Sequence, residues 1–311
     1  MQYSPAPLHI PDGFLSLVVS IICWVISAIT LSAAIARSNK SLGERQIPLM
    51  GVMAAFIFAA QMINFPVAGG TSGHLLGGAL AAITLGPWAG MLVMTAVIVV
   101  QALLFQDGGL LVMGANILNM GLVTAAIGYG LYRAAAAGNR TLKLTVAGIA
   151  AWLSVMAAAL FTSLQLWLSG TSQLQIVIPA MLGVHALIGL GEALITVAAL
   201  TLILQTRPDL LGENSASAKG SRGWVVAGVL ISLAVVLLSP LASADPDGLE
   251  RVAEDLGFLG KGFSAPYQLI PDYTLPFLGQ SNLSTVLAGL IGLIVVGAVI
   301  VLLGQGLRAK S

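Results

Sequence analysis

Three histidines are the side chains in this sequence best suited to binding a metal ion, and two of them lie next to long apolar runs. His9 belongs to the segment HIPDGFLS, just before the first apolar run, and His74 follows the glycine-rich stretch AGGTSG. Imidazole nitrogens are borderline ligands that suit Ni(II), Co(II), Cu(II) and Zn(II). His9 and His74 are therefore candidate ligands of one metal ion, with a structural role for each as the alternative.

The third histidine lies inside an apolar run together with a carboxylate. His185 precedes Glu192 by seven residues, which places both side chains on nearly the same face of a helix. Ionisable groups inside a membrane are costly and often mark ion or proton pathways. The interpretation we favour makes Glu192 a buried partner of His185 or of a neighbouring amide. The alternative is a proton-coupled secondary divalent-metal transporter that uses His185 and Glu192.

Other polar side chains are candidates for orienting a ligand histidine. Asn116 and Asn119 lie three residues apart in GANILNMG, and they either link helices or orient a ligand. Asp12 follows Pro11 and is expected to cap a helix that begins near Phe14, with a hydrogen bond to a ligand histidine as its second possible role. The sequence lacks H-E-x-x-H, and Asp12 is the sole external carboxylate near these histidines, so a hydrolytic metalloenzyme is a weak alternative.

The elements that position these residues are predicted to be membrane helices. Of the 311 residues, 58% are hydrophobic and 8% are charged, with a mean hydropathy of +0.98. Soluble domains carry roughly a quarter charged residues. Only helices and closed barrels satisfy their backbone in a bilayer, and these runs lack the alternation of barrel strands. The sequence predicts an all-α polytopic membrane protein with about nine transmembrane helices, at residues 14–36, 47–64, 74–85, 88–105, 111–132, 144–168, 178–204, 224–242 and 283–304.

The charges in the connecting segments predict the orientation of the chain. Of the 13 lysines and arginines, all except Arg251 and Lys261 fall on one side of the membrane if the N-terminus is outside. Lys and Arg concentrate in cytoplasmic loops. We therefore expect an N-terminus outside, a cytoplasmic C-terminus, and His9 and His74 at the outer face. The expected location is the cell membrane, as a multi-pass protein typical of a bacterial inner membrane.

Composition divides the chain into two membrane blocks. Residues 8–205 are expected to form a metal-binding domain of seven helices, and residues 206–222 a polar cytoplasmic linker. Residues 223–311 are expected to form a two-helix accessory module with an external loop at about 243–282, which carries most of the external charge. The lone Cys23 lies in the first apolar run, so neither a disulfide framework nor a thiolate metal cluster is expected.

Four segments in order resemble the CbiM/NikM family, the metal-binding membrane components of energy-coupling-factor nickel and cobalt transporters. They are HIPDGFLS at 9–16, GTSGHLLGGALAA at 70–82, GANILNMG at 114–121 and HALIGLGEALIT at 185–196. A fifth segment, DPDGLERVAEDLGF at 245–258, resembles the two-span accessory subunit of nickel systems. The resemblance therefore implies a fusion of both proteins and favours nickel over cobalt.

The resemblance also implies how the protein works and with what. It implies a transporter subunit that is not an enzyme, has no cofactor, and captures Ni(II) or Co(II) at the outer face. Its partners would be a transmembrane coupling subunit and ABC-type ATPase subunits, since the chain lacks a G-x-x-x-x-G-K-[ST] motif. Nucleic acid is not an expected partner.

The resemblance implies a ligand set that depends on where the chain starts. In the family, a histidine follows the initiator methionine, and the amine, the amide nitrogen and the imidazole chelate the metal in a plane that the loop histidine completes. Here His9 would be the chelating histidine, His74 the fourth ligand, and Leu8 the residue with the main-chain amine. We therefore expect the true start to be residue 8, by initiation at a leucine codon or by trimming; otherwise an internal amide or another donor is needed.

Overall fold

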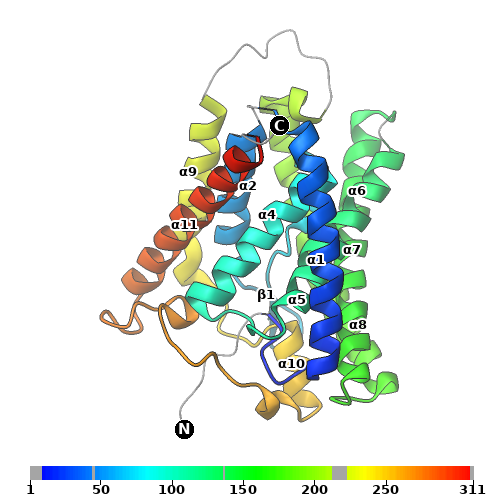
Figure 1. The fold of residues 1–311 in the computed structure, drawn as a ribbon, viewed down its shortest axis with the longest axis vertical. Coiled ribbons are helices and arrows are strands. Elements are labelled where there is room, and N and C mark those ends of the chain that lie inside the picture. The colour runs from blue at the N-terminus through cyan, green and yellow to red at the C-terminus, as the bar shows by residue number, and fades with distance from the viewer. Residues whose placement is uncertain (1–8, 44–45, 136, 212–222, 309–311) are drawn as a thin grey trace.

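The computed structural model describes residues 9–43, 46–135, 137–211 and 223–308, which form a bundle of helices with one short hairpin (Figure 1). The α-helices of the bundle are α1 (Leu17–Ser41), α2 (Gln46–Gln61), α3 (Gly78–Leu85), α4 (Pro87–Val100), α5 (Met113–Asn116), α6 (Thr124–Ala134), α7 (Arg140–Leu168), α8 (Leu174–Thr206), α9 (Gly223–Leu238), α10 (Gly248–Asp255) and α11 (Asn282–Arg308). Two π-helical stretches continue them, η1 (Gln101–Phe105) after α4 and η2 (Ile117–Val123) between α5 and α6. Short 3-10 turns are η3 (Pro208–Leu211), η4 (Ser239–Leu241), η5 (Leu259–Lys261) and η6 (Pro271–Tyr273).

Six helical segments in the described residues are long and apolar enough to cross a membrane. The shorter α2 is also apolar, and residues 113–134 run through α5, η2 and α6 without a break. The third expected span, 74–85, is helical only over the eight residues of α3, because residues 74–77 have no regular secondary structure and Gly77 has a positive φ of 84°. Nine crossings and the orientation of the termini stay predictions.

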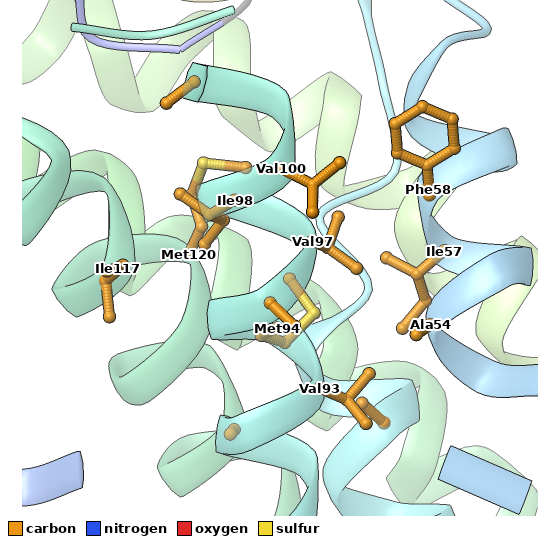
Figure 2. Close-up of a cluster of buried hydrophobic side chains, with 14 of the residues drawn as sticks. Ala54, Ile57, Phe58, Val93, Met94, Val97, Ile98, Val100, Ile117 and Met120 are labelled. Carbon is orange, nitrogen blue, oxygen red and sulfur yellow. The ribbon is translucent and has the colours of Figure 1, made fainter. Parts of the chain in front are cut away.

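Helix α4 lies at the centre of the bundle. In the segment Pro87–Phe105, 72% of an apolar stretch of 18 residues is buried inside the protein. In Leu17–Lys40, the buried share of the corresponding stretch is 28%. Figure 2 shows Val93, Met94 and Val97 of α4 between side chains of α2 on one side and Ile117 and Met120 of η2 on the other. Because lipid is as apolar as these side chains, close packing rather than exclusion of water holds helices together in a membrane.

The chain turns back between α2 and α3 in a β-hairpin. Strand β1 (Phe65–Val67) pairs antiparallel with β2 (Thr71–Gly73), with Phe65 opposite Gly73. Gly69 and Gly70 form the turn with positive φ angles, which glycine adopts without steric cost. His74 directly follows β2, so the hairpin decides where this histidine lies.

The C-terminal part of the chain packs against the rest at several places. Helices α9 and α11 lie beside α2 (Figure 1), and α10 packs on α8 and β2 at one end of the bundle. There the main-chain N–H of Ser72 donates to the Pro246 carbonyl at 2.8 Å, and the Ser72 hydroxyl donates to the Asp245 carbonyl at 2.8 Å. The segment before α10 therefore continues the edge of the hairpin that leads to His74.

Candidate metal site

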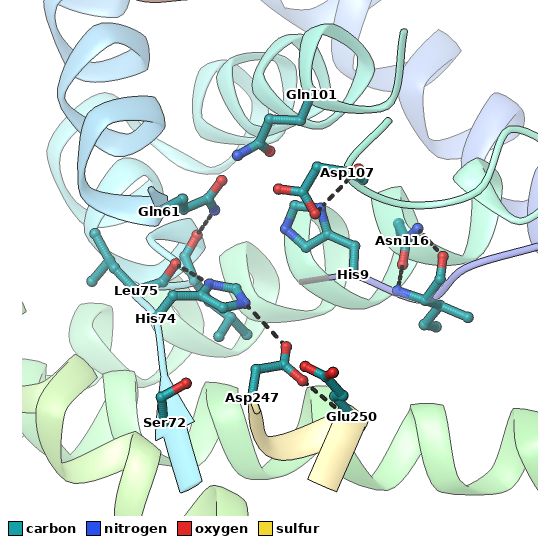
Figure 3. A network of polar contacts seen from close by, with 12 residues as sticks. His9, Gln61, Ser72, His74, Leu75, Gln101, Asp107, Asn116, Asp247 and Glu250 are labelled. Atoms are coloured by element: carbon teal, nitrogen blue, oxygen red, sulfur yellow. Dashed lines mark hydrogen bonds and ion pairs between the residues drawn. The ribbon is translucent and has the colours of Figure 1, made fainter. Parts of the chain in front are cut away.

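The structure brings His9 and His74 together. Both side chains are buried, and their ring centroids lie 5.5 Å apart with the ring planes at 78° (Figure 3). They line a cavity of about 60 Å³, and His185 and Asp247 lie in the wall of the same cavity. Two imidazoles from segments 65 residues apart in the sequence, at positions 9 and 74, therefore face one small space.

Glu192 fixes the segment that carries His74. Its carboxylate is fully buried and accepts the main-chain N–H groups of Leu76 at 2.6 Å and Gly77 at 2.9 Å. His185 is engaged elsewhere, with its Nδ1 2.8 Å from the Met181 carbonyl. Of the two partners expected for Glu192, His185 and a neighbouring amide, the structure shows main-chain amides.

Asn116 fixes the segment that carries His9. Its side-chain oxygen accepts the main-chain N–H of Ile10 at 3.1 Å, and its side-chain nitrogen donates to the Ile10 carbonyl at 3.0 Å. The side-chain amide of Asn116 thus pairs with the main chain of Ile10 as a neighbouring β-strand would. Both polar groups of the Ile10 main chain and both ends of the buried Asn116 amide are hydrogen-bonded in this way. Asn116 thus acts on the backbone next to His9 rather than on its imidazole.

Asp12 has a different role from the helix cap expected for it. Ser16 is the N-cap of α1, and its hydroxyl accepts the N–H of Val19 at 3.4 Å. The carboxylate of Asp12 instead accepts three main-chain N–H groups, at 2.9, 2.9 and 3.1 Å, from residues 110, 111 and 112. The prediction that Asp12 caps the first helix was wrong. Ser16 is the residue that caps α1, and Asp12 instead binds the main-chain N–H groups of the turn before α5.

Asn119 links two helical segments. Its side-chain nitrogen donates to the Thr162 hydroxyl at 3.1 Å and to the Gln165 side-chain oxygen at 2.7 Å, and the Gln165 nitrogen donates back at 2.8 Å. Asn119 and Thr162 also line the cavity. Of the two roles considered for this residue, these contacts are those of a link between η2 and α7.

Two carboxylates beside the histidines were missed in the sequence. Nδ1 of His9 lies 3.2 Å from the main-chain oxygen of Asp107 and 3.3 Å from its Oδ1. Nε2 of His74 lies 4.0 Å from Oδ2 of Asp247. The other oxygen of this carboxylate, Oδ1, accepts the main-chain N–H of Glu250 at 2.8 Å and so caps α10. Asp247 stands in the DPDGLE segment, so that motif was a usable signal, whereas no motif marks Asp107.

Burial shifts the pKa values of His9 and Asp247. It lowers the pKa of His9 below its ordinary value, and the neighbouring Asp107 carboxylate acts in the opposite direction. Burial raises the pKa of Asp247 to about 7, which hydrogen bonding to the Glu250 amide partly offsets. A neutral His9 keeps a lone pair available for a metal ion.

The donors around the cavity set limits on how a metal could bind. Within the described ranges, His, Cys, Asp and Glu side chains do not form a group of three or more arranged to hold a metal ion. Leu8, the expected source of a main-chain amine, lies outside the described residues. An imidazole closes a small chelate ring with its own amide nitrogen only through Nδ1, and Nδ1 of His9 faces Asp107.

Comparison with known proteins identifies the family of this chain. The family profile described as "Cobalt uptake substrate-specific transmembrane region" (CbiM) matches residues 9–210. The chain belongs to the CbiM family. A second profile, the PDGLE domain, matches residues 222–309, so a CbiM region is followed by a PDGLE module in one chain.

Two relatives match this chain over nearly its whole length. A putative fused nickel transport protein NikMN of Archaeoglobus fulgidus is 37% identical over 292 residues, covering 93% of this chain and 95% of the relative. The fused nickel transport protein NikMN of Rhodobacter capsulatus is 29% identical, covering 98% and 99%. A crystal structure of a transition metal transporter is 33% identical, with a TM-score of 0.59, and covers 68% of this chain and all of the solved one. This CbiM–PDGLE chain is thus a multi-pass membrane protein of a metal-transport family.

Proposed function

We propose that this chain is the metal-capturing permease component of an ATP-driven energy-coupling-factor importer for nickel, with cobalt as the second possible cargo. The observation that carries the proposal is the pair of buried imidazoles, His9 and His74, beside a cavity of about 60 Å³. The names of the fused relatives, which are nickel transport proteins, support nickel as the cargo.

The proposed ligands are the imidazoles of His9 and His74, with the main-chain amine of Leu8 and the main-chain amide nitrogen of His9 added in a chain that starts at residue 8. Four nitrogens in a plane suit low-spin Ni(II). Asn116 and Glu192 serve the site indirectly, since each fixes the backbone beside one histidine. The metal would enter from the outer face and leave inward when the protein reorients.

The proposed importer needs separate subunits for ATP hydrolysis and for coupling. In this scheme residues 8–205 capture the metal, residues 206–222 link the two parts, and residues 223–311 form the accessory module in the cell membrane. Most of the linker, from residue 212 onward, lies outside the described residues. The docking of the 245–248 segment beside His74 supports a joint role of the two parts in loading.

Uptake measurements separate this proposal from proton-coupled transport. Radioactive nickel uptake would be followed in cells that express the chain with and without coupling and ATPase subunits. The proposal expects uptake that requires both partners. Uptake by the chain alone that an uncoupler abolishes would instead favour the proton-coupled transporter. The two main-chain bonds already accepted by Glu192 weigh against a proton relay at this residue.

A further inference from the structure

The cavity that His9 and His74 face has further metal-ligating side chains in its wall. His185 of α8 and Asp247, the residue before α10, line it together with His74. The proposed ligand set uses neither His185 nor Asp247. A Cβ added at Gly248 would lie 3.0 Å from Cε1 of His185, so the edge of this ring lies against the backbone next to Asp247. Two imidazoles and a carboxylate therefore line one small space where α8 meets the C-terminal module.

Main-chain groups fix the orientation of all three side chains. Nδ1 of His185 lies 2.8 Å from the Met181 carbonyl. Nδ1 of His74 lies 3.0 Å from the Leu75 carbonyl. Because a carbonyl oxygen only accepts hydrogen bonds, each Nδ1 carries the proton and each Nε2 keeps a lone pair. Oδ1 of Asp247 caps α10, and Oδ2 of the same carboxylate is turned toward His74 (Figure 3). Metal-binding side chains usually have their second polar atom anchored in this way.

The spacing of two of these atoms is close to that of ligands on one metal ion. Two ligands of a tetrahedral ion, each about 2.0–2.1 Å from it, lie about 3.3 Å apart. Nε2 of His74 and Oδ2 of Asp247 lie 4.0 Å apart, so a movement of about 0.7 Å would bring them to that spacing. The described residues hold no preformed group of three such ligands, so the ion itself would draw these side chains together.

We propose that His185 and Asp247 form an entry site, which holds a divalent metal ion before the ion reaches His9, with His74 as the ligand shared by both positions. Two imidazoles and a carboxylate suit Ni(II), Co(II) and Zn(II). A site on a transport route binds well enough to admit the ion and weakly enough to release it. The proposal rests on the proposed function, since it takes His9 and His74 as ligands of the final site.

The entry site draws on both parts of the chain. Asp247 lies in the PDGLE module, whereas His74 and His185 lie in the CbiM region. The bonds from Ser72 to the carbonyls of residues 245 and 246 hold the segment that carries Asp247 at the cavity. The site is therefore complete only while this segment is docked.

The test measures how fast Ni(II) loads into the full 311-residue chain in detergent, at a series of metal concentrations. An ion that first binds an entry site loads at a rate that reaches a plateau at high metal concentration. His185→Ala and Asp247→Asn should lose this plateau. At low metal concentration, both should load about 10-fold more slowly or worse, since even residues that only orient a ligand cause such a loss when replaced. Asparagine caps a helix as well as aspartate does, so Asp247→Asn keeps α10 capped.

Asp255→Asn is the matched control, because it makes the same substitution at an exposed position of α10 and should load like the wild-type protein. Loading of His185→Ala or Asp247→Asn with the wild-type rate and plateau would overturn the proposal. A smaller final amount of bound nickel in either variant would also overturn it, because the residue would then be a ligand of the final site. Failure of the proposed function gives a different result, in which His9→Ala binds as much nickel as the wild-type protein.

Discussion

Replacement of Glu192 by glutamine tests how the His74 segment is held. The carboxylate accepts the N–H groups of Leu76 and Gly77 at 2.6 and 2.9 Å in a fully buried place. Glutamine is nearly the same size but has one acceptor oxygen, and its NH₂ group cannot accept an N–H. Glu192→Gln therefore leaves one buried main-chain donor without a partner.

The cost of this change follows from the number of bonds lost. One hydrogen bond to a charged group contributes about 1.5–3 kcal/mol, and a buried donor without a partner costs a similar amount. The free energy needed to open the 74–77 segment should therefore fall by about 1.5–3 kcal/mol, which corresponds to about 10- to 150-fold faster amide exchange. Metal affinity should fall as well, since His74 lies two residues before Leu76.

Hydrogen exchange measures the opening of this segment directly. Exchange would be followed by mass spectrometry in detergent, on a peptide that covers residues 70–80, without metal. Glu254→Gln, at an exposed position of α10, is the control that removes the same charge. If Glu192→Gln exchanges in this peptide at the wild-type rate, the carboxylate does not hold the segment and the reasoning fails.

Two further substitutions test the packing around the cavity. Gly248→Val places a side chain where a Cβ would lie 2.7 Å from Ile188 and 3.0 Å from His185, so residues 245–258 should detach and be cleaved faster by a protease, whereas wild-type resistance would contradict this docking. Asn119→Leu removes the bonds to Thr162 and Gln165, and it should lower the free energy of unfolding by about 1–3 kcal/mol, measured by thermal unfolding in detergent. An unchanged transition would show that Asn119 does not link η2 to α7.

The long helices could be predicted from the sequence because apolar run length is enough to define a membrane span. The seventh and ninth expected spans, 178–204 and 283–304, fall inside α8 and α11. The third expected span, 74–85, is an exception, because only residues 78–85 of it are helical. There the left-handed Gly77 and the main-chain hydrogen bonds to Glu192 keep residues 74–77 out of the helix, and a contact 116 residues distant cannot be predicted from local hydropathy.

The two histidines of the candidate site could be predicted from the sequence segments in which they lie. The carboxylates that surround them could not be predicted. His9 and His74 do lie together, while Asp107 and Asp247 approach them only through tertiary folding. Asp12 was expected to act within its own segment and instead binds the turn at 110–112. Contacts between side chains and segments about 100 or more residues apart leave no periodic signal in one sequence.

Native mass spectrometry of the nickel-loaded protein tests the central claim most directly. The wild-type chain would be compared with His9→Ala and His74→Ala, and the same spectra give the residue at which the chain starts. We expect one nickel ion in the wild-type protein and none in either variant. A chain that still holds nickel without His9 or without His74 would contradict it, and the wall of the cavity around His185 would become the place to search for the ligands.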